Sequence, residues 1–473
     1  MKKFLSILLA LVIVLGLCAC GGEGGGEGGS SAKSLQVGFG KEKITPSHQV
    51  QISGGGDSSR LSNGYKEFLY TTCIALTDAS GNTVLIYTQD LQQVSPSFAE
   101  PARKQVSEAT GVPVENIMIS ATHTHSAPGS NVNNKGIAEY KEIYLKGMVK
   151  AAQTAMADRS AAEISIGSTQ ATGLVFVRHY ELSNGTFAGS SFGNFGSGSI
   201  VGHSTPAQEE LQIIKFTRAA EDKKDVVLFN LGAHATYFSP IQYKELSTDF
   251  PGPARDYVEE QTGCLAAYFM SAAGDQVPDT KIASEDHGLD YKGYGQAVGK
   301  LVVEALPNLK TVNSGDIKIN QKYYAVETNT RGFDRYDDAK KVYDFYKGGG
   351  GKEAADAMAV SLGFIGVYEA RAIVNNKNKG ESTDINLNAV SIGDISFVFA
   401  PYEMFGVNGK QIRDGSPYEM TFVASQSNET YDYIPSERGY EIDCYEAYTS
   451  FANKGTGEKL ADFFVDMLKE LKG

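Results

Sequence analysis

Two histidines two residues apart are the side chains of this sequence best suited to chemistry. His123 and His125 lie in the run Ser120-Ala-Thr-His-Thr-His-Ser-Ala-Pro-Gly129, directly after an apolar stretch that ends at Ile119. We expect that stretch to be a strand, in which alternate side chains share a face, so that both rings enter one pocket. Neutral imidazole is a common zinc ligand and also transfers protons near pH 7. The alternative is that both rings cap the strand through hydrogen bonds.

Other apolar runs also end in residues that can bind or react. Val226–Leu231 is followed by Gly232-Ala-His234, and Leu265–Met270 is followed by Ser271-Ala-Ala-Gly-Asp275. Ligand sites of α/β proteins lie at the ends of such strands. The sequence therefore predicts an α/β fold, a single large mixed domain with its site residues at strand ends.

Helices and hairpins are expected between these strands. Phe98–Thr110 has a helical pattern that ends at Gly111, and Thr71–Leu76 with Thr83–Tyr87 is typical of a hairpin. Residues 337–375 are helical in pattern apart from a glycine run, and they resemble a helical insertion that could act as a lid.

The first 34 residues resemble an export signal and a tether. Lys2 and Lys3 precede the apolar run Phe4–Leu17, which is short for a membrane-spanning helix and typical of a secretory signal. Leu17-Cys-Ala-Cys-Gly21 resembles a lipoprotein cleavage box with Cys20 as the lipidated residue; a plain transmembrane anchor is the alternative. We expect a signal peptide, a lipidated cysteine with a Gly/Glu/Ser tether, and one large domain, over residues 1–19, 20–34 and 35–473.

Charge and cysteine content exclude some classes of protein. The formal net charge is −13, and it becomes −15 once residues 1–19 and their two lysines are removed. Nucleic-acid binding needs a basic surface, so we expect no nucleic-acid partner, and membrane contact only through the lipid anchor. After Cys20 the sequence contains Cys73, Cys264 and Cys444, so we expect no dense disulfide framework. The anchor predicts a location on the extracytoplasmic face of a bacterial cell envelope.

Five short blocks hold the candidate site residues: Ile119-Ser-Ala-Thr-His-Thr-His-Ser-Ala-Pro-Gly129, Phe229-Asn-Leu-Gly-Ala-His234, Gly274-Asp-Gln-Val-Pro278, Ala400-Pro-Tyr-Glu403, and Tyr431-Asp-Tyr-Ile434 with Tyr440-Glu-Ile-Asp-Cys-Tyr-Glu446. In this order the blocks resemble those of the neutral/alkaline (non-lysosomal) ceramidases, a family of zinc-dependent amidases. The resemblance spans about residues 36–446 and covers the N-terminal catalytic domain of that family. The chain is thus identified as a divergent bacterial lipoprotein member.

The resemblance implies a zinc site. His123 and His234 resemble the two zinc-binding histidines of the family, while Glu403 and Tyr433 resemble the carboxylate and phenolate that complete the metal shell. Such a set leaves room for a water molecule or a substrate carbonyl on the metal. Without the resemblance, Glu403 could equally be a surface carboxylate and Tyr433 a core tyrosine.

The resemblance also implies catalytic and substrate-binding residues. His125 or Asp275 would accept a proton, Tyr445 would donate a hydrogen bond near the oxyanion, and Arg178 is similar to the substrate-contacting arginine of the family. The alternative for Tyr445 is a place in the core, and for Arg178 a plain salt bridge.

Two departures from the family pattern bear on function. In ceramidases a serine, the proposed nucleophile, directly precedes the proline of the block at Gly274–Pro278, and here Val277 takes that position. Three readings remain: attack by zinc-activated water, replacement of the serine by another hydroxyl such as Ser271, or loss of hydrolysis. The sequence also ends soon after Tyr445, so we expect no C-terminal immunoglobulin-like domain.

The resemblance implies a zinc-dependent hydrolase that cleaves the amide (N-acyl) bond of a small-molecule or lipid-like substrate, with metal-activated water as the nucleophile. The alternative is a catalytically retired, surface-tethered binding lipoprotein with the same fold. A purely structural or adhesive lipoprotein is a third reading, and it would need none of the five blocks.

Overall fold

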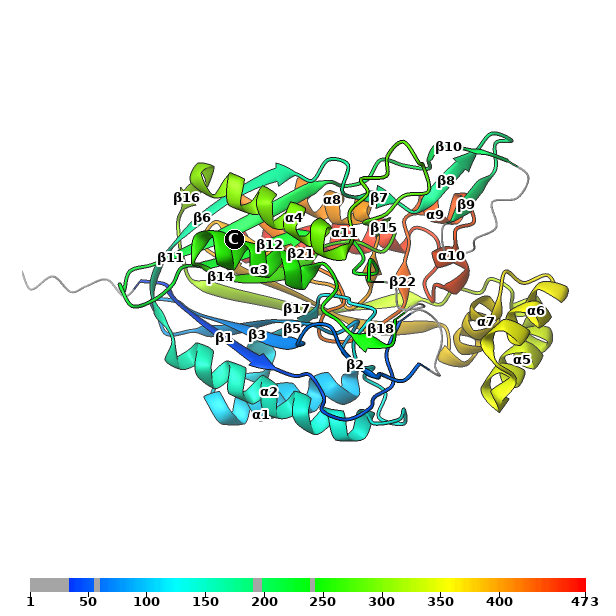
Figure 1. The fold of residues 1–473 in the computed structure, drawn as a ribbon, viewed down its shortest axis with the longest axis horizontal. Coiled ribbons are helices and arrows are strands. Elements are labelled where there is room, and N and C mark those ends of the chain that lie inside the picture. Colours follow the sequence, from blue (N-terminus) through cyan, green and yellow to red (C-terminus); the bar gives the residue numbers. More distant parts are fainter. Residues whose placement is uncertain (1–33, 55–59, 190–197, 239–242) are drawn as a thin grey trace, which may run out of the picture. The chain divides into compact units, whose positions relative to one another are not determined.

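Two β-sheets packed face to face form the centre of the protein (Figure 1). The computed structural model describes residues 34–54, 60–189, 198–238 and 243–473. The smaller sheet contains, in spatial order, β17 (Ile317–Glu327), β18 (Ser382–Ile392), β19 (Ile395–Phe399) and β21 (Met420–Ala424). The larger sheet contains, in spatial order, β14 (Leu265–Met270), β12 (Val226–Leu231), β11 (Glu210–Arg218), β6 (Ser160–Gln170), β1 (Gln36–Lys43), β3 (Tyr70–Thr77), β4 (Thr83–Gln89) and β5 (Ile117–Ala121), and β16 (Lys310–Val312) also pairs with β6.

The strands of the larger sheet are apolar on both faces because both faces are covered. In β4, Val84 and Ile86 pack toward the smaller sheet, where they join Phe397 and Phe422. The alternate residues of β4 pack in the opposite direction, against helices. Burial on both faces explains why these strands read as continuous apolar runs rather than as alternating ones.

Helices cover the outer faces of both sheets. The first pair covers the β3–β5 half of the larger sheet, the second pair covers the β11–β14 half, and the third pair covers the smaller sheet. The layers therefore run helix, sheet, sheet, helix, which confirms the predicted mixed α/β fold. The three pairs are α1 (Pro96–Thr110) with α2 (Ile137–Ala157), α3 (Pro251–Thr262) with α4 (Tyr291–Ala305), and α8 (Gly406–Gly415) with α11 (Thr456–Lys472).

The predicted local elements agree closely with the structure. The hairpin is formed by β3 and β4, which pair antiparallel. The predicted helix is α1, which begins two residues earlier than expected, with Pro96 in its first turn, and ends before Gly111 at a φ of 74°. The strand expected from the apolar stretch before the histidine pair is β5 (Ile117–Ala121), which ends two residues before His123.

Short strands and helices connect these layers near the strand ends. The short strands pair as β2 (Gly64–Tyr65) with β13 (Glu245–Leu246), β7 (Phe176–Val177) with β15 (Gln276–Val277), β20 (Glu403–Met404) with β22 (Tyr433–Ile434), and β8 (His179–Leu182) with both β9 (Phe187–Gly189) and β10 (Ile200–His203). Two short helices follow β22, namely α9 (Glu437–Glu441) and α10 (Tyr445–Thr449).

A group of helices leaves the smaller sheet between the neighbouring strands β17 and β18 (Figure 1). It comprises α5 (Tyr336–Phe345), a π-helical turn (Tyr346–Gly350), α6 (Lys352–Ser361) and α7 (Val367–Lys379), and we call it the helical excursion. Ala339, Val342, Ala359 and Phe364 form an apolar core of its own. Its helices coincide with the segment that the sequence marks as a helical insertion.

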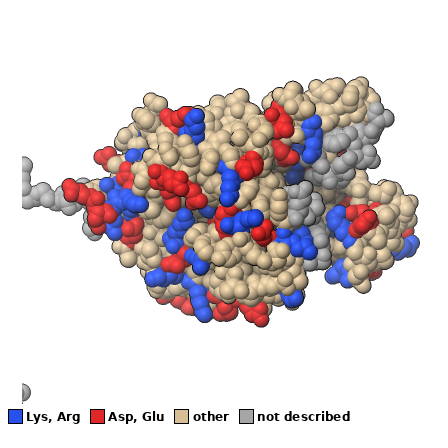
Figure 2. Space-filling view, viewed as in Figure 1, with Lys and Arg blue, Asp and Glu red and all other residues tan. Residues whose placement is uncertain are grey.

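The ends and the surface add three observations. The expected signal peptide and Cys20, with all of the tether except Ser34, lie outside the described residues. Within the described ranges, no helix has both the length and the apolar character needed to cross a bilayer. On the face shown in Figure 2, lysine and arginine are interspersed with aspartate and glutamate instead of gathering in a basic patch.

The larger sheet curls so that its two edges approach each other. β14 and β5 are at opposite ends of the strand order, yet the Thr88 hydroxyl on β4 donates a hydrogen bond to the Tyr268 carbonyl on β14, at 2.6 Å. Beside this closure, Arg255 on α3 donates from both terminal nitrogens to the two carboxylate oxygens of Asp90, each at 2.9 Å. Both side chains of the pair are buried. A bidentate pair of this kind is strong and geometrically specific.

We predict that Arg255→Met lowers the free energy of unfolding by about 3–5 kcal/mol, because it leaves the Asp90 carboxylate buried without its counter-charge. Urea unfolding measures this loss. The double variant Asp90→Leu/Arg255→Met removes both charges and should be more stable than the single variant. A double variant that loses as much stability as the sum of the two single variants would contradict the pairing.

Candidate active site

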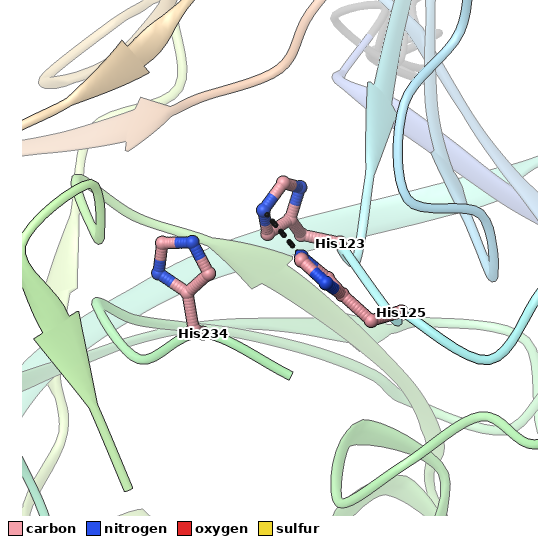
Figure 3. A group of neighbouring side chains, drawn as sticks. All are labelled: His123, His125 and His234. Atoms are coloured by element: carbon pink, nitrogen blue, oxygen red, sulfur yellow. Dashed lines mark hydrogen bonds between the residues drawn. The ribbon is translucent and has the colours of Figure 1, made fainter. Parts of the chain in front are cut away.

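The candidate residues meet where several strands end. His123 follows β5, His234 follows β12, and Glu403 begins β20 just after β19. The pairs β4–β5, β12–β14 and β19–β21 are parallel, so the loops after their carboxyl ends emerge at a shared edge. Curling of the larger sheet then brings the loop after β5 to the loop after β12, where the His125 N–H donates to the Ala235 carbonyl at 3.1 Å. Figure 3 shows the three imidazole rings gathered at this point.

The histidine pair is held by a loop and not by a strand. His123 has a φ of 64°, which is unusual for a residue other than glycine, and its N–H donates to the Leu91 carbonyl at 2.9 Å. The expectation that strand alternation aligns His123 with His125 was therefore wrong. The turn still brings the rings together, with the two Nε2 atoms 3.1 Å apart. Such a backbone conformation costs energy and is common at functional sites.

Backbone carbonyls fix the orientation and tautomer of two of these rings. Nδ1 of His123 lies 2.7 Å from the Gln92 carbonyl oxygen, and Nδ1 of His234 lies 2.6 Å from the Ala273 carbonyl oxygen. A carbonyl oxygen can only accept, so Nδ1 carries the proton in each ring. In a neutral ring Nε2 then presents a lone pair. Metal-ligating histidines are oriented by hydrogen bonds of this kind.

The two lone pairs point at the same carboxylate oxygen. Oε2 of Glu403 lies 3.3 Å from Nε2 of His123 and 3.1 Å from Nε2 of His234. Burial lowers the pKa of His234, and the nearby Arg178 charge lowers it further, which favours the neutral ring. Burial alone would raise the pKa of Glu403, but the His123 and His234 rings, in the form that carries a proton on Nε2, hold it well below its usual range.

A cation resolves this crowding of acceptors. Neutral Nε2 atoms and an ionised carboxylate offer only lone pairs to one another, so their approach is favourable only with a proton or a metal ion between them. Two imidazole nitrogens and a carboxylate oxygen are also the ligand types that zinc prefers. Nε2 of His125 belongs to the same group, since the ligand nitrogens of the three histidines all lie within 4.8 Å of one another. The residues present therefore fit a divalent metal ion.

Two tyrosines reach the same place. β22 pairs in parallel with β20, and this register sets Tyr433 directly opposite Glu403. The Tyr433 ring stacks on the His234 ring, with the ring centroids 6.4 Å apart. The Tyr445 ring contacts the Tyr433 ring edge-on, with the centroids 6.2 Å apart. Both tyrosines, with His125 and Glu403, line a cavity of about 410 Å³, a size typical of small-molecule sites.

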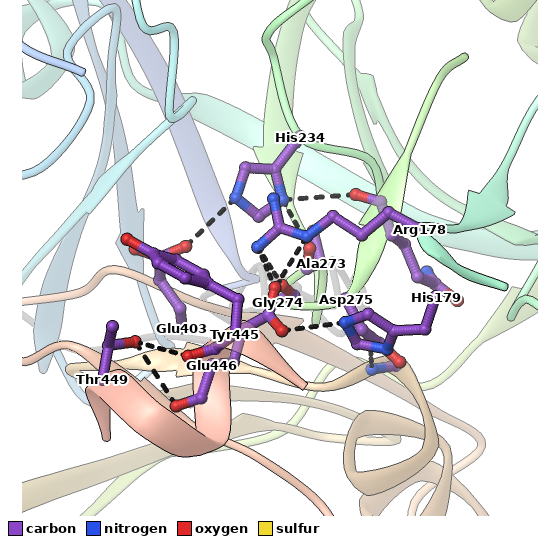
Figure 4. Close-up of polar contacts among 12 residues, drawn as sticks. Arg178, His179, His234, Ala273, Gly274, Asp275, Glu403, Tyr445, Glu446 and Thr449 are labelled. Atoms are coloured by element: carbon purple, nitrogen blue, oxygen red, sulfur yellow. Dashed lines mark hydrogen bonds and ion pairs between the residues drawn. The ribbon is translucent and has the colours of Figure 1, made fainter. Parts of the chain in front are cut away.

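Arg178 lies behind the cavity wall. Its Nε donates to Oε1 of Glu446 at 2.8 Å, and Nη2 donates to the same oxygen and to the Gly274 carbonyl at 3.0 Å. The other Glu446 oxygen, Oε2, lies 2.8 Å from Nε2 of His179 (Figure 4). The guanidinium lies over the Tyr433 ring, 5.4 Å from its centroid. Arg178 therefore forms a buried salt bridge that backs Tyr433, and it is absent from the described cavity wall.

Three further candidates also lie away from the described wall of the cavity. Oδ1 of Asp275 accepts the N–H of Gly406 at 2.7 Å, and burial raises the pKa of this carboxyl. Val277 is buried in the β15–β7 pair opposite Phe176. The Ser271 hydroxyl is buried and has no hydrogen-bond partner within the described ranges.

The structure adds residues that were not among those predicted from the sequence. Gln92 orients His123 through its carbonyl, and Glu446 binds Arg178 and His179. Tyr346, Tyr368 and Arg371 of the helical excursion line the cavity. Gln92 comes three residues after the end of β4, as His234 does after β12, and this position was an available signal. The helical excursion carries no comparable sequence signal.

Comparison with known proteins identifies the family. The model of the neutral/alkaline non-lysosomal ceramidase N-terminal domain matches residues 35–294. The chain belongs to this family. A neutral ceramidase of Drosophila pseudoobscura pseudoobscura is 26% identical over 124 residues, which cover 26% of this chain and 16% of that protein. The match thus spans a small part of the insect ceramidase.

Solved ceramidase structures share the fold. The neutral ceramidase from Pseudomonas aeruginosa superposes with a TM-score of 0.70 at 17% identity, covering 93% of this chain and 74% of that one. A ceramidase complexed with C2 gives the same TM-score and identity and covers 93% of this chain and 75% of the other. The ceramidase fold therefore extends over nearly all of this chain, beyond the 35–294 segment.

We predict that the contribution of Glu446 to stability is lost in acid. Burial would raise the pKa of this carboxyl, but Arg178 and His179 hold it far below its ordinary value of 4.5. On acidification the unfolded chain therefore takes up the proton first, so the contribution is complete above pH 4.5 and falls below it. The stability difference between the parent protein and Glu446→Gln should shrink by about 1.4 kcal/mol per pH unit in that range.

Urea unfolding of both proteins between about pH 6 and about pH 3 measures this difference. A difference that stays constant across that range would show that the ion pair does not titrate as described.

Proposed function

We propose that this chain is a zinc-dependent hydrolase that cleaves an amide (N-acyl) bond. The observation that carries the proposal is the convergence of two oriented histidine lone pairs and the Glu403 carboxylate at 3.1–3.3 Å. His123, His234 and Glu403 would hold the metal, with Tyr433 completing the set. When bound, zinc supplies Lewis acidity, which polarises a carbonyl group and makes water nucleophilic near neutral pH.

The residues around the metal position would divide the remaining work. His125 faces the cavity, and its Nε2 lies 3.1 Å from Nε2 of His123, so a neutral imidazole there is placed to accept a proton. In the proposed reaction it accepts a proton from the attacking water and passes it to the leaving nitrogen as the C–N bond breaks. The products are a carboxylate and an amine. Tyr445 on the cavity wall donates a hydrogen bond to the developing oxyanion.

Two side chains support water as the nucleophile. Val277 has no hydroxyl, and the Ser271 hydroxyl is buried away from the described cavity wall, whose own serines are Ser53, Ser95 and Ser130. Asp275 accepts a hydrogen bond from Gly406 and lies away from the wall, so His125 is the better placed base. If hydrolysis has been lost, the same pocket would serve a binding lipoprotein, and the first experiment below separates the two.

The proposal extends to the location of the protein. The apolar run Phe4–Leu17 and the box that ends in Cys20 and Gly21 support export followed by lipidation. We propose that the protein is lipid-anchored through Cys20 on the extracytoplasmic face of a bacterial cell envelope.

We predict that His234→Ala removes stoichiometric zinc and abolishes hydrolysis. Removing a group that only hydrogen-bonds to a metal ligand lowers metal affinity about 10–100-fold, and removing the ligand itself costs more. Metal analysis of the purified full chain gives the first readout. Release of carboxylic acid from a panel of short-chain N-acyl amines, with and without a chelator, gives the second. His48→Ala, a half-buried histidine outside the cavity, is the matched control.

Undiminished zinc in His234→Ala would overturn the metal assignment. Full zinc in the parent protein without release of acid from any amide would favour the binding lipoprotein.

We predict that Cys20→Ser shifts the protein from the membrane fraction to the soluble fraction of expressing cells, because the lipid is the proposed anchor. Fractionation with detergent-phase partitioning measures the shift. Cys73→Ser, a buried thiol of the domain, is the control and should remain membrane-bound. Membrane retention of Cys20→Ser would instead indicate that Phe4–Leu17 stays in the chain as the anchor.

A further inference from the structure

The wall of the cavity opposite the metal position is polar. It is built from loops and from the helical excursion, and it presents glutamine, asparagine, serine and tyrosine side chains with Arg371 and Asp432. The one aliphatic residue on the described wall is Ile52, which is 2% exposed because its side chain packs into the core beneath α2. Apart from the faces of its tyrosine rings, this part of the cavity therefore offers little apolar surface to a long hydrocarbon chain.

Three amide side chains on this wall are free to bind a ligand. Gln51, Gln93 and Asn134 are half-buried and line the cavity. The side-chain amide of each makes no hydrogen bond to another described residue. Each amide offers both a donor and an acceptor. If hydrocarbon covered these amides, they would lose their hydrogen bonds to water and gain no others, at a cost of about 1–3 kcal/mol for each group.

The helical excursion adds aromatic faces and a neutralised charge. Tyr346 and Tyr368 line the cavity, and the Arg371 guanidinium lies over the Tyr368 ring at 4.8 Å. Nη2 of Arg371 lies 3.8 Å from Oδ1 of Asp432, so the two charges balance without a close hydrogen bond. Because the pair is neutral overall, a ligand that binds to it needs no charge of its own. Adjacent hydroxyl groups can accept from the guanidinium and donate to the carboxylate.

We propose that the substrate is hydroxyl-rich, namely an N-acylated amino sugar or a closely similar amino polyol with a short acyl group. Hydroxyls both donate and accept, which matches an array of amides and an arginine–aspartate pair. The tyrosine rings offer faces against which the C–H surface of a sugar ring can pack. The proposal deepens the proposed function and rests on it for the amide-cleaving step, while the binding preference rests on the wall alone. A site built of hydrogen-bonding groups rejects analogues that lack the matching groups.

Two substrates that share one acetamide test the proposal. N-acetylglucosamine presents the amide on a hydroxyl-rich ring, and N-acetylsphingosine presents it on a long-chain base. With the zinc-loaded full chain, acetate release gives kcat/KM for each, and calorimetric titration gives binding without turnover. We expect the sugar to be preferred at least about 100-fold in kcat/KM and to bind more tightly.

Variants of the wall connect the preference to named residues. Gln93→Met and Asn134→Leu remove amides at similar size, and each should weaken sugar binding about tenfold, the value of one lost hydrogen bond. Gln153→Met changes an exposed glutamine on α2 and should leave binding unchanged. Zinc content should stay at the parent level in all three variants.

The outcomes separate this inference from the proposed function. Sugar binding without acetate release from either compound would support the substrate class and contradict the hydrolase. Equal or better binding and turnover of N-acetylsphingosine would overturn the substrate class and leave the hydrolase intact. Failure to bind the sugar at all, or sugar binding unchanged in Gln93→Met and Asn134→Leu, would also overturn the substrate class.

Discussion

The closure of the larger sheet is the constraint on which the site depends. His123 follows an edge strand and His234 follows a strand near the opposite edge, so an open sheet would hold them far apart. The Thr88–Tyr268 hydrogen bond and the buried Asp90–Arg255 pair mark where the edges meet. Both contacts lie just before the loop that carries Gln92, whose carbonyl orients His123. The closure of the sheet thus brings together the residues of the candidate metal site.

A second constraint acts at short range. The ligand set is assembled from rigid backbone: two carbonyls fix two imidazoles, and the β20–β22 register sets Tyr433 beside Glu403. Side chains oriented in this way need little reorganisation when a cation binds, and this preorganisation favours tight binding and catalysis. Behind them, Glu446 holds Arg178 against Tyr433, so the Arg178 charge is itself fixed in position.

Much of this arrangement could be predicted from the sequence, and the failures have physical reasons. Apolar runs such as Val226–Leu231 predict buried strands, and the polar residue after each run predicts the edge of the sheet where the site residues meet. The conformation of His123 could not be predicted in this way, because a positive φ at a non-glycine residue is imposed by contacts from Leu91 and Gln92 that are distant in sequence. The role of Arg371 could not be predicted for a related reason. The sequence of a polar helix does not show which of its faces lines a cavity formed by other parts of the chain.

The separate core of the helical excursion has a consequence for evolution. Its apolar residues pack mainly against one another, while Tyr346, Tyr368 and Arg371 project into the cavity. Tyr346 and Tyr368 also pack against the core of the excursion, so substitutions at these positions would act on the excursion and not on the packing of the two sheets. Members of this fold can therefore differ in the ligand that the cavity accepts while the residues around His123, His234 and Glu403 stay the same. The excursion is where such differences should be sought.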